Sequence, residues 1–207
     1  LIDSNNNNIL MSQSSACLAY FGNKFKLLGN NKYEESDCFQ LLLETVDLRN
    51  IITSFAYTHY ENKELELKAA NEVFNKAFEN NNTGKLQKFE HWLSKKNKDN
   101  MFLINDKPTI PDFNFFDILD FYLEFVKYYN FITNKNNKNI FQELEYPNIS
   151  NFYNNFIELP KMQKYLNSIF YKLPYTNKSA RFGSGIKGDT WNHTSQIDET
   201  PLEIIIN

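Results

Sequence analysis

The spacing of apolar residues after Gly29 is the strongest constraint on the fold. Between Lys32 and about Tyr60 these residues recur at steps of three and four: Phe39, Leu42, Leu43, Val46, Ile51, Phe55 and Ala56. This period predicts one long amphipathic helix. A second such stretch runs from about Leu65 to Lys95, and the turn-forming segment 80–84 is placed to kink or break it. Two long helices in succession predict an antiparallel pair that opens an all-helical domain.

Composition narrows the class of protein. The 207 residues are enough for one or two domains, and the formal net charge of -3 argues against nucleic-acid binding. No apolar run is long enough to predict a membrane span. Cys17 and Cys38 lie on predicted helices without the spacing of metal ligands, so we expect two reduced, buried thiols and no metal.

The N-terminal segment predicts a strand that leads into a helix. Residues 9–11 form a short apolar run, typical of a mostly buried strand, and the small and polar residues 12–15 suit a helix N-terminus. Free backbone N–H groups and the positive end of the helix dipole would meet at Gln13 and Ser14. A carboxylate would bind well there, although for the dipeptide alone an ordinary helix cap is the favoured interpretation.

A second helix start stands at Thr109-Ile110-Pro111-Asp112. Thr109 and Asp112 have the spacing of a capping box, and proline is tolerated in the first turn of a helix. The helix that follows is apolar on more than one side, which predicts that it is buried. Further helices are predicted from Glu145 to Ile157 and over residues 161–170, separated by Leu159-Pro160.

These segments together resemble the cytosolic glutathione S-transferases of the mu and sigma classes. Residues 1–29 are similar to the family's LIDG…QSNAI..Y…..L.G pattern, and TIPDF to its T-x-A-D-F box. Residues 145–170 follow its FPNL..F..R.E.LP.I..Y stretch, and the SARFG of residues 179–183 its NKSARFG-like ending. The resemblance covers residues 1 to about 183.

The resemblance implies a mainly α fold with three parts. Residues 1–30 would be the last strands and helix of a thioredoxin-like α/β domain that binds glutathione. Residues 31–183 would be the all-α C-terminal domain of a glutathione S-transferase, and residues 184–207 an extended tail. The family's catalytic Tyr or Ser hydroxyl would then lie upstream of Leu1.

The activity implied by the resemblance is the conjugation of the glutathione thiol to small hydrophobic electrophiles, with glutathione as co-substrate. By the same resemblance Gln13 and Ser14 hold the γ-glutamyl carboxylate, and Asp47 reaches across a dimer to the glutathione amino group. Tyr57 would line the electrophile pocket, with Thr176 and Asn177 covering it. Thr109 and Asp112 would be a structural cap.

Alternatives remain open at several of these positions. Asp47 fits a solvated helix carboxylate paired with Lys or Arg, and Tyr57 fits a core or interface aromatic residue. The three histidines have no partners at useful spacing and are interpreted as surface or structural residues: His59, His91 and His193.

Two functions from different classes are compatible with this sequence. One is a cytoplasmic detoxification enzyme that forms a homodimer or a heterodimer with a related subunit. The other is a non-catalytic structural or scaffold subunit whose tail contacts a larger assembly. A thioredoxin-like redox protein is disfavoured because the sequence contains no C-x-x-C.

Overall fold

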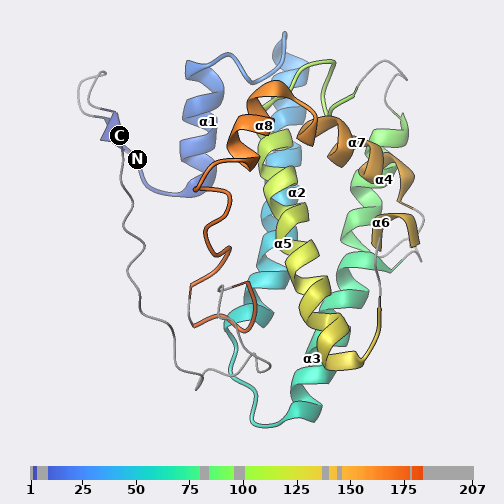
Figure 1. Ribbon diagram of the computed structural model, residues 1–207. Coiled ribbons are helices and arrows are strands. Elements are labelled where there is room, and N and C mark those ends of the chain that lie inside the picture. Colours follow the sequence, from blue (N-terminus) through green and yellow to red (C-terminus); the bar gives the residue numbers. More distant parts are fainter. Residues whose placement is uncertain are drawn as a thin grey trace.

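The protein is mainly α-helical in a computed structural model that describes residues 2–3, 9–79, 84–95, 101–136, 140–143, 146–177 and 179–183 (Figure 1). The tail predicted over residues 184–207, with His193, lies outside the described residues. The elements are, in chain order, β1 (Ile2–Asp3), β2 (Ile9–Leu10), α1 (Ser14–Lys24), α2 (Lys32–Tyr57), α3 (Lys63–Phe78), α4 (Lys85–Lys95), α5 (Ile110–Thr133), α6 (Ile140–Glu143), α7 (Pro147–Ile157) and α8 (Pro160–Leu166).

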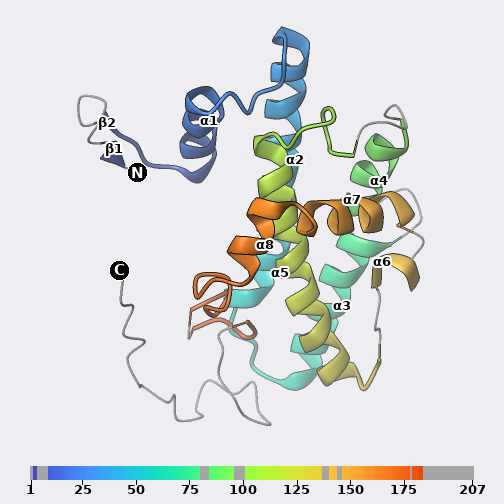
Figure 2. The same ribbon diagram turned by 45° about the horizontal axis from the view of Figure 1, so that its top comes forward.

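The two strands form a small antiparallel ribbon in which Ile2 pairs with Leu10. Figure 2 shows this ribbon set apart from the helices. The side chain of Leu10 is 80% exposed, so the prediction of a mostly buried strand is wrong at this residue. A two-stranded ribbon has no second layer of its own, and no described element covers this one.

α1 lies against the start of α5, and a glycine allows the close approach. A Cβ atom on Gly22 would come within 2.7 Å of Leu28 Cδ2 and 3.0 Å of Ile110 Cγ2. The backbone N–H of Ile110 also donates to the carbonyl of Leu27 at 3.0 Å. These contacts fix the connection between α1 and α2 on the first turn of α5.

The long helix predicted from Lys32 is confirmed as α2, which ends at Tyr57. The second periodic stretch is two helices, α3 and α4, broken at the predicted place. At Gly84 a Cβ atom would lie 2.4 Å from the carbonyl oxygen of Glu79, so the backbone passes too close for a side chain. Asn31 and Asn62 cap α2 and α3 by accepting hydrogen bonds from first-turn N–H groups.

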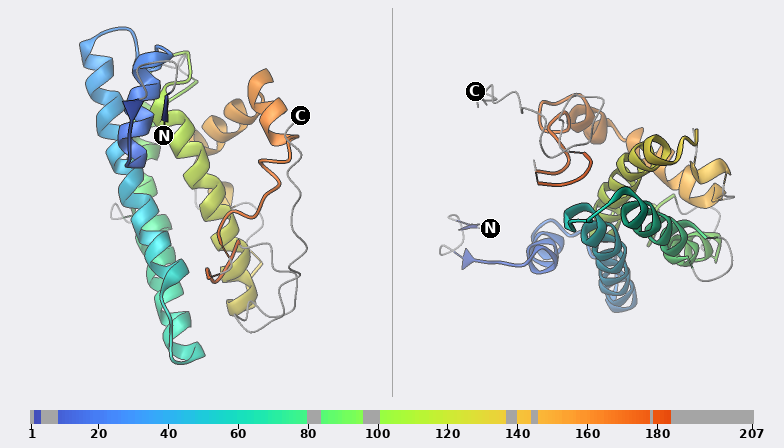
Figure 3. Two further views of the ribbon diagram at one scale, coloured as in Figure 1. Left: turned by 90° about the vertical axis from the view of Figure 1, so that its left-hand side faces the viewer. Right: turned by 90° about the horizontal axis from the view of Figure 1, so that it is seen from below.

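α5 is the central helix, as its apolar composition predicts. Figure 3 shows it between α2 on one side and α7 and α8 on the other. Its Phe115 ring stacks on Phe89 of α4 with the ring centroids 4.1 Å apart. The buried Tyr122 donates its hydroxyl proton to the carbonyl of Leu48 at 2.8 Å, which satisfies the phenol inside the α2–α5 interface.

The predicted capping box at the start of α5 is present. Oδ2 of Asp112 accepts from the backbone N–H of Thr109 at 2.7 Å and from its hydroxyl at 2.6 Å. Oδ1 accepts from the N–H of Leu103 at 2.7 Å. Asp112 therefore joins the incoming loop to the helix.

A buried carboxylate on α4 positions α7. Oε1 of Glu90 accepts from the backbone N–H and side-chain amide of Asn148, and Oε2 from the N–H of Ile149. These donors belong to the first turn of α7, where a negative charge is favoured. α8 ends at Leu166, before the predicted Phe170, and the next residues form turns that carry the chain back along α5.

Candidate functional site

Gln13 and Ser14 stand at the exposed start of α1, where the sequence predicts them. Gln13 is the N-cap residue, with φ 69° and ψ 122°, and its side chain does not cap the helix. A positive φ is strained for a residue with a side chain. Because the Gln13 side chain does not cap the first turn, the first-turn N–H groups offer donors to an anion at the positive end of the helix dipole.

Asp47 forms an ion pair within the chain. Its Oδ2 lies 3.1 Å from Nζ of Lys85, and more than half of its side chain is exposed. This is the arrangement that the alternative interpretation of Asp47 predicts. Among the described residues, no hydrogen bond or ion pair joins Asp47 to Gln13 or Ser14 within one chain. A contact of Asp47 with glutathione in a partner subunit stays a prediction.

The structure brings the segment containing Thr176 and Asn177 to the end of α2 where Tyr57 stands. The N–H of Thr176 donates to the carbonyl of Gly183 at 2.9 Å, which closes a loop over residues 176–183. The N–H of Arg181 then donates to the carbonyl of Ala56 at 3.0 Å. Tyr57 is 45% exposed, so its phenol is not part of the core.

Arg181 anchors this loop, and the sequence analysis missed it. Its Nη1 lies 2.7 Å from Oε1 of Glu66, and its Nε and Nη2 donate to the carbonyl of Thr58 at 2.9 and 2.6 Å. The guanidinium carbon lies 4.4 Å from the centroid of the Tyr60 ring. Arg181 is only 8% exposed, so this is a largely desolvated ion pair.

Phe182 fixes the same loop from inside. It is completely buried, and its ring lies within 6.3 Å, centroid to centroid, of four aromatic rings: Phe55, Phe121, Phe125 and Tyr128. The adjacent Arg and Phe of SARFG were the sequence signal that could have indicated an anchored loop, because a planar hydrogen-bond donor is followed directly by a large apolar ring. Its partners lie far away in the sequence, which is why the pattern alone did not reveal the contact.

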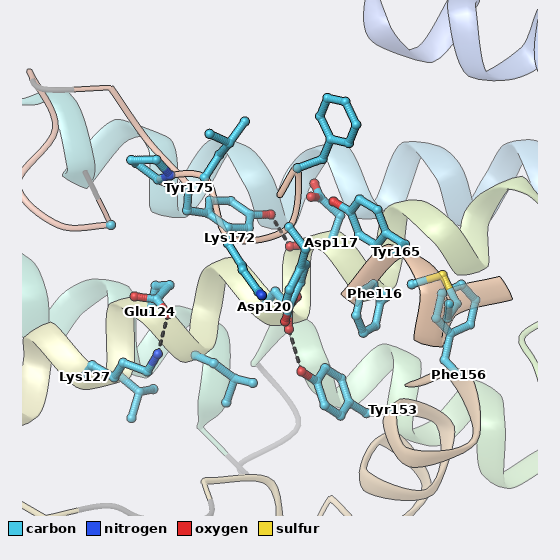
Figure 4. Close-up of a pocket in the computed structure, with 18 of the residues that line it drawn as sticks. Phe116, Asp117, Asp120, Glu124, Lys127, Tyr153, Phe156, Tyr165, Lys172 and Tyr175 are labelled. Atoms are coloured by element: carbon cyan, nitrogen blue, oxygen red, sulfur yellow. Dashed lines mark hydrogen bonds and ion pairs between the residues drawn. The ribbon is translucent and has the colours of Figure 1, made fainter. Parts of the chain in front are cut away.

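A hollow with a volume of about 1440 Å³ lies beside α5. Its walls come from α5, α7, α8 and residues 170–175 of the returning chain (Figure 4). We call it the α5 hollow. Tyr175 and Gly183 line it, whereas Gln13, Ser14, Asp47, Tyr57, Thr176 and Asn177 do not. The predicted site residues are therefore outside the α5 hollow.

Asp120 is the buried carboxylate of the α5 hollow. Its Oδ1 accepts from the hydroxyl of Tyr153 at 2.5 Å (Figure 4). Its Oδ2 accepts from the hydroxyl of Tyr171 at 2.9 Å. Burial raises the pKa of Asp120, although these two hydrogen bonds lower it, and the nearby carboxylates of Asp117 and Glu124 raise it further. Burial also raises the pKa of both phenols, so they remain neutral donors.

Within the described residues, no group of three or more His, Cys, Asp or Glu side chains has the arrangement to hold a metal ion. Both cysteines are free thiols, and burial raises the pKa of Cys38 to about 11, which keeps it protonated at neutral pH. None of the described helices combines the length and apolarity needed to cross a membrane.

Comparison with known proteins assigns this helical bundle to a family. A family model for "Glutathione S-transferase, C-terminal domain" matches residues 46–169. Two proteins of Schistosoma mansoni named glutathione S-transferase class-mu 26 kDa isozyme are 32% and 30% identical to 86% and 84% of the chain. The chain covers 66% and 68% of these relatives' own length. This protein belongs to the glutathione S-transferase family.

Solved structures agree on the fold. The glutathione S-transferase Blo t 8 superposes with a TM-score of 0.67 at 20% identity, over 88% of this chain and 74% of that one. The Pi-class glutathione S-transferase of Onchocerca volvulus superposes with a TM-score of 0.60 at 21% identity, over 82% and 71%. At these identities the comparison supports the fold alone, so any chemical activity has to be inferred from the residues of this chain.

Proposed function

We propose that the protein is a glutathione transferase that binds glutathione at the start of α1 and conjugates it to hydrophobic electrophiles. The thiolate sulfur would attack the electrophilic carbon, forming a C–S bond while the leaving group departs or a proton is taken up. A free thiol is mostly protonated at neutral pH, so a hydroxyl donor that stabilises the thiolate is required. By family likeness that donor belongs to a segment that precedes Leu1 in the relatives.

The strained Gln13 at an uncapped helix start is the observation that carries this proposal. Strain of this kind persists where surrounding structure enforces it, and it is concentrated at functional sites. The exposed Ser14 hydroxyl and the first-turn N–H groups of α1 offer donors to a carboxylate. The γ-glutamyl carboxylate of glutathione is the ligand group that we assign to them.

The remaining parts of the proposed site extend the same assignment. Tyr57, Thr176 and Asn177 would contact the electrophile at the end of α2. Asp47 would reach the glutathione amino group of a second subunit in a homodimer or a related heterodimer, exchanging its Lys85 partner for an ammonium. A cytoplasmic location and a role in detoxification are the matching expectations for the whole protein.

Calorimetric titration of the full-length protein with glutathione tests the carboxylate site. Ser14→Ala should weaken glutathione binding about tenfold, because a hydrogen bond to a charged group is lost. Cysteinylglycine lacks the γ-glutamyl carboxylate, so its weaker affinity should be the same for both proteins. Ser14→Thr, which keeps a hydroxyl, should restore most of the glutathione affinity.

Ser12→Ala is the matched control, since Ser12 is an exposed serine that precedes the helix. It should leave both affinities unchanged. Glutathione binding that is indifferent to Ser14→Ala, or an equal loss with Ser12→Ala, would remove the assignment of this site.

A scaffold subunit is the second candidate, and two observations favour it. Gln13 and Ser14 lie outside the α5 hollow, and Asp47 is already paired with Lys85. A scaffold should bind neither glutathione nor cysteinylglycine at millimolar concentration, so the same titration separates the two functions.

A further inference from the structure

The α5 hollow has aromatic walls around a buried carboxylate. Phe116 stacks on Tyr153 and on Phe156, with ring centroids 5.3 and 5.0 Å apart. Tyr165 meets Tyr171 edge to face at 5.4 Å. Figure 4 shows Asp120 among the labelled side chains of Phe116, Tyr153 and Tyr165. The faces of such rings attract cations, most strongly where water is excluded.

Among the charged side chains that line the hollow, Asp120 is the buried one, and it forms no ion pair with another described residue. Arg49 pairs with Asp117, and Lys127 with Glu124. Lys172 also lines the hollow and is an exposed side chain, so its charge is hydrated. Asp120 is 8% exposed and is contacted by two neutral phenols. Two hydrogen bonds reduce the desolvation cost of a carboxylate but do not neutralise it.

We propose that the α5 hollow binds an aromatic cation, with the ligand's positive charge beside Asp120 and its rings among Phe116, Tyr153, Tyr165 and Tyr171. Each part of the ligand then meets its complement: the charge meets the unneutralised carboxylate, and the flat apolar surface meets aromatic side chains.

The size of the hollow sets the class of ligand. Its volume of about 1440 Å³ exceeds the ~300–1000 Å³ typical of small-molecule pockets, so it suits fused rings or several linked rings. The hollow follows α5 from Phe113 to Asn130, which favours an elongated molecule. The inference does not depend on glutathione binding, because none of the residues assigned to glutathione lines the hollow.

Fluorescence titration with two aromatic probes of opposite charge tests the proposal. Acridine orange, a planar monocation, should bind at one site per chain. The monoanion 8-anilinonaphthalene-1-sulfonate should bind at least about tenfold more weakly, because it meets Asp120 with a like charge. Equal affinities for the two probes would overturn the cation assignment.

Asp120→Asn removes the charge and keeps the shape. It should weaken acridine orange about tenfold and leave or strengthen the binding of the anion. Glu124→Gln is the matched control, since it removes the same charge from the same helix and lining but at a residue paired with Lys127. An equal loss with both variants would mean that only the general field of the protein is sensed, and would also overturn the proposal.

The pH dependence of the unaltered protein gives a measurement that does not rely on a variant. Protonation of Asp120 removes its charge, so acridine orange affinity should fall as the pH is lowered from neutral into the range where Asp120 titrates. Asp117, Glu124, Tyr153, Tyr171 and Lys172 also face this group. The anion's affinity should rise over the same range, and pH-independent binding of both probes would contradict a role for Asp120.

Discussion

Asp112 shows how a single side chain can join a loop to a helix at an electrostatic cost. It accepts three hydrogen bonds and is completely buried. Burial raises the pKa of this carboxyl group from 3.8 to about 6, although each of the hydrogen bonds lowers it. The cap is therefore a network in which desolvation outweighs the stabilisation of the charge.

Asp112→Ala should lower the free energy of unfolding by about 3 kcal/mol, because it leaves buried donors of Thr109 and Leu103 without an acceptor. Urea denaturation measures this. Asp106→Ala, at an exposed carboxylate in the preceding loop, should change stability by about 0.5 kcal/mol or less. A loss below about 1 kcal/mol for Asp112→Ala would mean that water or neighbouring groups replace the network.

The sign of the pH effect follows from the raised pKa. Between pH 3.8 and about 6 the folded protein holds a proton on Asp112 that the unfolded chain has lost, so this group's stabilising contribution decreases as the pH rises through about 6. Asp112→Asn cannot titrate. The stability difference between the natural protein and this variant should shrink from pH 4 to pH 7, and a difference that grows would contradict the raised pKa.

At the scale of elements, most boundaries follow from local chemistry. The start of α2, the break between α3 and α4 and the start of α5 lie where the apolar period, the turn-forming segment 80–84 and the capping box predict them. α8 is shorter than predicted, because residues 167–173 turn back toward α5. Apolar periodicity alone does not predict this turn, because the apolar residues within 167–173 are also spaced as in a helix.

The contact of α1 with α5 depends on Gly22. Alanine favours a helix by about 1 kcal/mol over glycine, but here its Cβ would meet buried Leu28 and Ile110. We expect Gly22→Ala to destabilise the protein by about 1–2 kcal/mol in thermal or urea unfolding, since overpacking outweighs propensity. Asn23→Ala, on the exposed next residue, should be neutral or stabilising. A stabilised Gly22→Ala would show that α1 moves freely on α5.

At the scale of the whole molecule, the loop of residues 176–183 closes the helical domain. Arg181 joins it to Glu66 of α3, 115 residues earlier in the sequence, and Phe182 inserts between α2 and α5. These contacts join segments that are far apart in the sequence. They therefore fix the position of the C-terminal segment, which contributes both to the α5 hollow and to the proposed electrophile site.

Arg181→Met should reduce the free energy of unfolding by about 3 kcal/mol, since it leaves the largely buried Glu66 charge with the neutral hydroxyl of Tyr128 in place of a cation. The loop should also become sensitive to limited proteolysis before the domain unfolds. Arg49→Met breaks a half-exposed ion pair with Asp117 and should lose about 1 kcal/mol or less. Equal losses for the two arginine variants would mean that the Arg181 pair is as well solvated as the surface pair.

The candidate site was predictable only where it depends on neighbours in the sequence. The helix start at Gln13 and Ser14 was predictable because a short apolar run, a polar segment and apolar residues at helical spacing follow one another directly in the sequence. Asp47 and Tyr57 could be placed on α2 but not given partners, since Lys85 is 38 residues from Asp47. The role of Asp120 was not predictable from the sequence, because the two tyrosines that donate to it are 33 and 51 residues away.

The sequence by itself determined the long helices, the capping box of α5, the break in segment 80–84 and the family. Each of these depends on backbone hydrogen bonds, side-chain size and apolar spacing within a few residues. The tertiary structure alone decided that Arg181 is a buried anchor, that Leu10 is exposed and that Asp120 stands in an aromatic hollow. Burial and pairing depend on which distant segments pack together, and that packing decides whether a charge or an apolar side chain meets water.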